Sequence, residues 1–112
     1  MPKYLISFDD GAMTFPREEL PEVARASHAV VDQAKAAGVW VFGAGLFSQQ
    51  ASIVAPDGTI TGGPYPETKA VIGGFSVVDV PTREEALAWA AKIAEACRCA
   101  QEVRVLIDDP DS

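Results

Sequence analysis

The chain has 112 residues, of which 48% are hydrophobic and 22% are charged, and its formal net charge at neutral pH is −7. This length predicts one domain over residues 1–112 with an ordered core at about 3–107, and the composition argues against a disordered chain. Phosphate binding requires clustered Lys and Arg, so the scattered basic residues of this acidic chain exclude a nucleic-acid partner.

Membrane insertion and metal binding are not expected either. No apolar run reaches the ~18 residues of a membrane span, and the first residues lack the apolar core of a signal peptide, so we expect a cytoplasmic protein with no membrane partner. Cys97 and Cys99 form a Cys-x-Cys pair. A structural zinc site needs about four ligands and only His28 adds a nitrogen, so we expect no metal. Gly43 and Gly45 lack the rest of a dinucleotide fingerprint, and we expect no cofactor.

The first part of the chain predicts a strand, a helix and a second strand. Residues 4–8 alternate in the manner of a strand. Pro21 suits the first turn of a helix, and Gly38 suits its end. One face of this helix gathers Val23, Ser27, Val30, Val31, Ala34 and Ala37. Residues 39–42 are apolar on both sides, which indicates a strand covered on both faces.

The second part predicts a hairpin, a strand, a helix and a closing strand. Residues 51–55 and 59–61 flank Pro56-Asp57-Gly58, a hairpin turn signature. Residues 75–80 form a strand, and Thr82 and Glu85 have the spacing of a capping box that starts a helix running to about Cys97. The buried stripe expected on this helix consists of Ala86, Leu87, Ala90, Ile93, Ala94 and Cys97. Residues 102–107 alternate as the last strand.

This order of elements predicts an α+β fold, with an antiparallel-rich sheet and two helices on one of its faces. Right-handed crossovers place both helices on the same side of the sheet. The other face stays open, although Trp40, Phe42 and Val77 leave little room for a fully polar face. We therefore expect a homodimer whose open sheet faces pack together.

A composite motif in residues 62–94 identifies a family. It consists of Gly63-Pro64, Glu67-Thr68-Lys69, Gly73-Gly74-Phe75 and the helical run from Glu85 to Ala90. In these residues the chain resembles the DGPF-motif branch of the YCII-related proteins, with Gly62 where Asp is usual and Tyr65 where Phe is usual. The resemblance implies a ferredoxin-like sandwich of the dimeric α+β barrel type. The function of this family is mostly unassigned, so the resemblance implies a fold rather than a reaction.

The candidate catalytic residues are His28 and Asp32 on the first helix. His28 is the single histidine, and Asp32 follows one turn later, where its carboxylate would orient the imidazole for general acid–base work. More distant YCII-related proteins are similar in pairing a histidine on this helix with an aspartate, but their aspartate lies near the helix end, where this chain has Ala36 and Ala37, so Asp32 would take its place. The alternative is a half-exposed histidine beside a surface carboxylate.

The candidate ligand-binding residues are Tyr65, Glu67, Lys69 and Trp40. The first three follow the Gly-Pro turn, and loops fixed by glycine and proline commonly carry binding groups. Lys69 would hold an anionic oxygen; the alternative is a solvated lysine beside a capped turn. Two adjacent carboxylates, Asp9 and Asp10, are more consistent with a strand-ending turn than with a cation site.

These observations leave two functions open, and a third of another class. The first is a small-molecule binding module with its pocket in a homodimer. The alternative is a cofactor-free lyase or isomerase that uses His28 as general acid or base on a small cyclic acid. The third is an accessory domain that binds another protein. We expect the first.

Overall fold

In a computed structural model of the chain, residues 2–47, 51–63 and 71–111 are described. The helices and strands follow the expected order. They are β1 (Lys3–Asp9), the short 3₁₀ helix η1 (Arg17–Glu19), α1 (Leu20–Ala36), β2 (Trp40–Gly45), β3 (Ser52–Val54), β4 (Ile60–Gly62), β5 (Ile72–Asp79), α2 (Arg83–Cys97) and β6 (Glu102–Val105).

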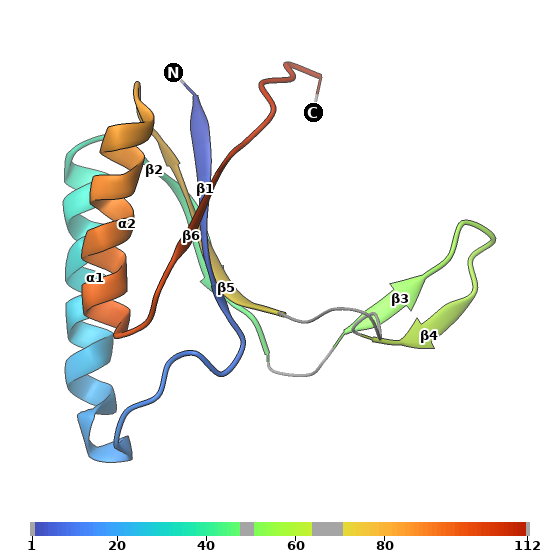
Figure 1. Ribbon diagram of the computed structural model, residues 1–112, viewed down its shortest axis with the longest axis horizontal. Helices are drawn as coiled ribbons and strands as arrows, with labels where there is room; N and C mark the ends of the chain where they lie inside the picture. Colours follow the sequence, from blue (N-terminus) through green and yellow to red (C-terminus); the bar gives the residue numbers. More distant parts are fainter. Residues whose placement is uncertain (1, 48–50, 64–70, 112) are drawn as a thin grey trace.

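Four of the strands form one antiparallel sheet in the order β2-β5-β1-β6. Strand β5 lies between β1 and β2, the two strands of the first β-α-β unit. Strand β1 lies between β5 and β6, the two strands of the second unit. Both helices cover the same face of this sheet, and the opposite face is open (Figure 1). The structure confirms the α+β, ferredoxin-like fold that the element order predicts.

The core lies between the helices and the sheet. On β1 the even-numbered residues Tyr4 and Ile6 are buried, which places this side of the strand against the helices. Val78 of β5 lies in the same layer and is fully buried. Complete burial of one such aliphatic side chain is worth roughly 1.5–3 kcal/mol. Helix α2 contributes mainly small residues, so it packs close to the sheet; its buried residues are Ala86, Ala90, Ile93, Ala96 and Cys97.

The helix ends follow local signals in the sequence. The backbone N–H of Glu85 donates to the Thr82 hydroxyl oxygen at 3.2 Å, which fixes the start of α2. Helix α1 has its proline in the first turn, and Gly38 follows its end with a φ of +73°. Helix α2 ends differently, because the left-handed residue after it is Arg98, with a φ of 58°.

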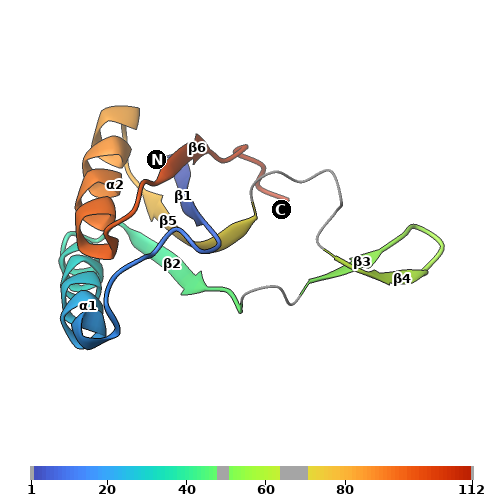
Figure 2. The same ribbon diagram turned by 60° about the horizontal axis from the view of Figure 1, so that its bottom comes forward.

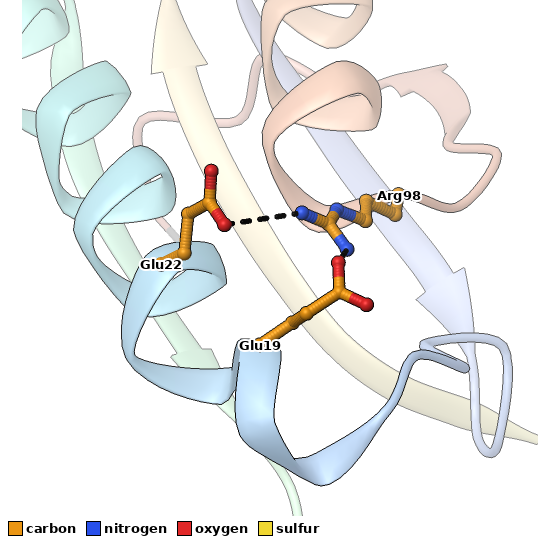
Figure 3. Close-up of polar contacts among 3 residues, drawn as sticks. All are labelled: Glu19, Glu22 and Arg98. Atoms are coloured by element: carbon orange, nitrogen blue, oxygen red, sulfur yellow. Dashed lines mark hydrogen bonds and ion pairs between the residues drawn. The ribbon is translucent and has the colours of Figure 1, made fainter.

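Arg98 connects the end of α2 to the start of α1. Its guanidinium forms an ion pair with Glu19 of η1, and its Nη2 lies 3.9 Å from Oε2 of Glu22 in α1 (Figure 3). A left-handed conformation costs a non-glycine residue about 1–2 kcal/mol. The two carboxylates offset part of that cost by holding the Arg98 side chain between the helices.

Two sequence-based expectations need correction, on the coverage of β2 and on the buried stripes of the helices. The side chain of Phe42 lies on the open face of the sheet and is 58% exposed, so β2 is not covered on both faces of the single chain. Leu87 is 38% exposed and Ala37 is exposed, so neither belongs to the buried stripe of its helix. The expected hairpin is confirmed, and its strands β3 and β4 form a two-stranded sheet separate from the main one. This hairpin projects from the body on the side of the main sheet that faces away from the helices (Figures 1 and 2).

Candidate functional site

A cavity of about 350 Å³ lies between the helices and the sheet. Both helices and three strands of the main sheet contribute to it. Its lining consists of Phe8, Met13, Ser27, His28, Val30, Val31, Trp40, Gly43, Ala44, Gly45, Phe75, Ser76, Ile93, Ala96, Cys97 and Gln101. The volume falls within the range of about 300–1,000 Å³ that is typical of small-molecule sites.

Two glycines make room for two aromatic rings in this cavity. A Cβ added at Gly43 would lie 2.7 Å from the Cη2 atom of Trp40, and a Cβ added at Gly74 would lie 2.5 Å from the Cζ atom of Phe8. The end of each ring therefore occupies the space above a glycine on the helix-facing side of β2 or β5. Gly45 lies at the same end of β2, and a Cβ there would meet no atom within 4 Å. The backbone of these strands thus provides the wall of the cavity together with the rings of Trp40 and Phe8.

The polar groups of the cavity are few, and most are neutral. Ser27 Oγ and Cys97 Sγ form a hydrogen bond of 3.5 Å between α1 and α2. Ser76 from β5 and Gln101 from the segment after α2 add a hydroxyl and an amide. His28 is the lining side chain that suits proton transfer near neutral pH. No Asp, Glu, Lys or Arg belongs to the lining in the described part of the chain.

The second thiol, Cys99, lies beside this site. The side-chain amide of Gln101 donates to the Cys99 carbonyl oxygen at 3.4 Å and to its Sγ at 3.5 Å. Burial raises the pKa of the Cys99 thiol, the charge of a Cys97 thiolate raises it further, and the Gln101 hydrogen bond opposes both effects. Cys99 is therefore a neutral thiol at pH 7 rather than a nucleophile.

The structure brings together two of the predicted site residues, because exposed His28 of α1 and half-buried Trp40 of β2 line the same cavity. Asp32 is exposed one turn further along α1 and does not line the cavity. Across residues 2–47, 51–63 and 71–111, no hydrogen bond or ion pair joins Asp32 to His28. Tyr65, Glu67 and Lys69 lie outside the described residues, so their roles stay predictions.

Several lining residues were not predicted from the sequence. Phe8 continues the alternation of Tyr4 and Ile6 in β1, so the strand period could have predicted that its side chain faces the helices. Gln101 and Met13 lie in connecting segments without such a period. Ser76 reads as an interruption of an apolar strand, and only the pairing of β5 with β2 shows that it faces the cavity.

Other parts of the molecule are less suited to bind a ligand. A groove of about 500 Å³ runs between the outer surfaces of α1 and α2, and its charged residues, among them Glu22, Lys92 and Arg98, are solvated. Asp9 and Asp10 lie at a turn, where the backbone N–H of Ala12 donates to the Asp9 carbonyl oxygen at 3.0 Å. Among the described residues, no three His, Cys, Asp or Glu side chains gather as metal ligands. In the same part of the chain, no helix has the length and apolar character to cross a membrane.

Comparison with known proteins adds one positive finding. The sequence model of the YCII-related domain matches residues 3–108, which is nearly the whole chain. None of the curated proteins matches the chain.

Proposed function

The chain belongs to the YCII-related domain family, and on this basis we propose that it binds a small, flat and largely apolar metabolite in the cavity between helices and sheet. The same proposal places the chain in a homodimer. We also assign it to the DGPF-motif branch of the family, on the residues that carry the motif.

The observation that carries this proposal is the chemistry of the cavity wall. Trp40 and Phe8 present two rings over glycines, and a planar or cyclic ligand gains both apolar burial and ring stacking against them. His28, Ser76 and Gln101 supply hydrogen-bonding groups that would orient such a ligand. A strongly charged ligand would find no opposite charge in the described lining, so a neutral ring compound fits best.

The homodimer is supported by the open face of the sheet. The strand pairing places the side chains of Phe42, Phe75 and Val77 on this face, away from the helices, whereas the backbone oxygen of Phe75 lies near Gly43 at the cavity. The rings of Phe42 and Phe75 form a pair with centroids 5.9 Å apart, although Phe42 is 58% exposed in the single chain. A second copy packed on this face would bury the ring pair and complete a third layer.

A second candidate function keeps the same cavity and adds a reaction. His28 is exposed at the border of the cavity that Trp40 also lines, so its imidazole would lie beside a ring compound bound there. In this role His28 would act as general acid or base in a cofactor-free lyase or isomerase, with Asp32 and Lys69 as the candidate orienting and anchoring residues.

The binding proposal is tested with a neutral fluorescent probe of flat, apolar shape, N-phenyl-1-naphthylamine. We expect the wild-type chain to bind it with enhanced fluorescence, and Gly45→Leu to abolish this signal, because a side chain at Gly45 enters the cavity without a steric clash. Ala91→Leu adds the same side chain at an exposed position of α2 and should bind as the wild type does. A wild-type chain that gives no signal, or an equal signal from Gly45→Leu, would reject the cavity as the site.

The catalytic candidate needs a separate measurement. Small lactones and halogenated acids are assayed with the wild type and with His28→Gln, which keeps a hydrogen-bonding side chain. Loss of general acid–base catalysis lowers turnover by roughly 10²–10⁴-fold. Turnover that is equal in both proteins, or absent from the wild type while the probe still binds, would leave a binding module without this chemistry.

A further inference from the structure

The β3–β4 hairpin (residues 51–63), called the arm below, is a well-formed ribbon. Its strands pair Ser52 with Gly62, Ile53 with Thr61 and Val54 with Ile60. At the tip, the backbone N–H of Thr59 donates to Asp57 Oδ1 at 2.8 Å, and Gly58 has a φ of +89°, which suits a tight turn. At the base, the N–H of Gly63 donates to the carbonyl oxygen of Ala51 at 2.9 Å.

One face of the arm is apolar and uncovered. Val54 and Ile60 are directly opposite each other, so their side chains lie on the same face of the ribbon. They are 63% and 69% exposed, respectively. A two-stranded hairpin is marginally stable in water by itself, and it gains stability when an apolar face packs on another surface. The arm therefore has the chemistry of a contact element whose partner lies outside the single chain.

The position of the arm indicates where that partner lies. In both views the arm extends from the side of the main sheet that faces away from the helices (Figures 1 and 2). The open sheet face, with the Phe42–Phe75 ring pair, is on this same side. A second copy that packs on the open face thus lies beside the arm, and two-fold symmetry gives each copy the arm of the other.

From this arrangement we propose that the arm clasps the second copy of the chain, with Val54 and Ile60 packed against the partner. The inference rests on the homodimer of the proposed function and adds a second contact region to it. Within residues 51–63, Asp57 is the single ionisable side chain. The arm has no basic residue to attract a nucleic acid or an anionic membrane, so an apolar protein surface is the occupant that fits it.

Sedimentation equilibrium of the intact chain tests this inference. We expect the double variant Val54→Ser/Ile60→Ser to raise the dimer dissociation constant by roughly tenfold or more, because two exposed aliphatic side chains per arm lose their burial in the dimer. The matched control, Leu20→Ser/Leu87→Ser, removes two exposed aliphatic side chains from the helices, and it should associate as the wild type does.

The possible outcomes separate this inference from the proposed function. A dimeric wild type whose arm variant associates equally well overturns the arm contact and leaves the face-to-face dimer intact. A monomeric wild type overturns both the dimer and the arm contact, while the probe titration still decides on the cavity.

Hydrogen exchange provides a readout that does not depend on a variant. Amides of residues 52–62 should be protected at protein concentrations above the dissociation constant and should exchange faster after dilution. Protection that stays the same at all concentrations would overturn the inference. The inference would also be overturned if neutral phosphatidylcholine vesicles, rather than a second copy of the chain, protected the amides of residues 52–62 in the intact wild-type chain.

Discussion

Alanine at Gly74 should weaken ligand binding and alanine at Gly73 should lower stability, although the two residues are neighbours in β5. At Gly74 an added Cβ would lie 2.5 Å from Cζ and 2.6 Å from Cε1 of Phe8. These atoms are the far end of a half-buried ring that borders the cavity, so the ring has space to rotate into it, and the next nearest atom, the backbone oxygen of Ala44, would be 3.2 Å from the added Cβ. At Gly73 the added Cβ would lie 2.8 Å from Cα and 3.0 Å from N of Asp10, which are backbone atoms.

The expected magnitudes follow from what each neighbour is able to do. Overpacking typically costs about 1–3 kcal/mol, and replacing glycine by alanine returns roughly 0.4–1 kcal/mol by restricting the unfolded chain. Because the Phe8 ring can move, the overpacking cost of Gly74→Ala should be near the low end of this range, and its free energy of unfolding should change by no more than about 1 kcal/mol. The turn after β1 has no such freedom, because its backbone is held beside the β1–β5 pairing, so Gly73→Ala should lose about 2 kcal/mol.

Urea unfolding followed by circular dichroism, at one fixed protein concentration, measures both changes. Titration with N-phenyl-1-naphthylamine then reports the cavity. Gly74→Ala should be nearly as stable as the wild type and should bind the probe at least ~10-fold more weakly, because the displaced Phe8 ring fills the site. Equal losses of stability in the two variants, or normal probe binding by Gly74→Ala, would refute the assignment of Phe8 to the cavity wall.

Three further changes test local interactions. Cys97→Ser removes a like charge, so the pKa of Cys99 should fall toward its ordinary value of 9.0 and alkylation by iodoacetamide, followed by mass spectrometry, should speed up. The raised pKa favours the neutral thiol in the folded chain, so its contribution to stability is present below pH 9.0 and is lost as the pH rises through the folded-state pKa. Hydrogen bonds from the side chain and then the backbone of Thr59 lower the pKa of Asp57, so Thr59→Val should raise it, as NMR titration of the carboxyl would show. Arg98→Gly removes exposed ion pairs worth up to about 1 kcal/mol, but it also removes about 1–2 kcal/mol of left-handed backbone strain. In urea unfolding it should therefore be at least as stable as the wild type. Arg98→Ala keeps the strain and should be less stable than Arg98→Gly.

The sequence was sufficient for the fold because local and tertiary signals agree. Local signals mark the bounds of the elements: Thr82 caps the start of α2, Gly38 follows the end of α1, and the alternation of residues marks the strands. Right-handed crossovers then place both helices on one face of an antiparallel-rich sheet, and the structure adds the strand order. The family resemblance, confirmed over residues 3–108, identifies the same fold independently.

The candidate site was less predictable, because it depends on contacts between distant segments. His28 and Trp40 could be named from residue type, but their shared cavity depends on the crossing of α1 over β2. The role of Gly74 depends on its register with Phe8, which is far away in the sequence. The exposure of Phe42 on the open face depends on the register shift between Trp40 and Phe42 in the β2–β5 pairing, which the residues of β2 themselves do not reveal.

The arm also has a consequence for how such a protein can diverge. Strands β2 and β5 are antiparallel neighbours, and such strands can be joined by a turn of as few as about two residues. The arm is longer than the turn that this connection requires, and none of its residues lines the cavity. On the proposed assembly, changes in the arm would alter the contact between copies of the chain without changing the residues that line the proposed ligand site.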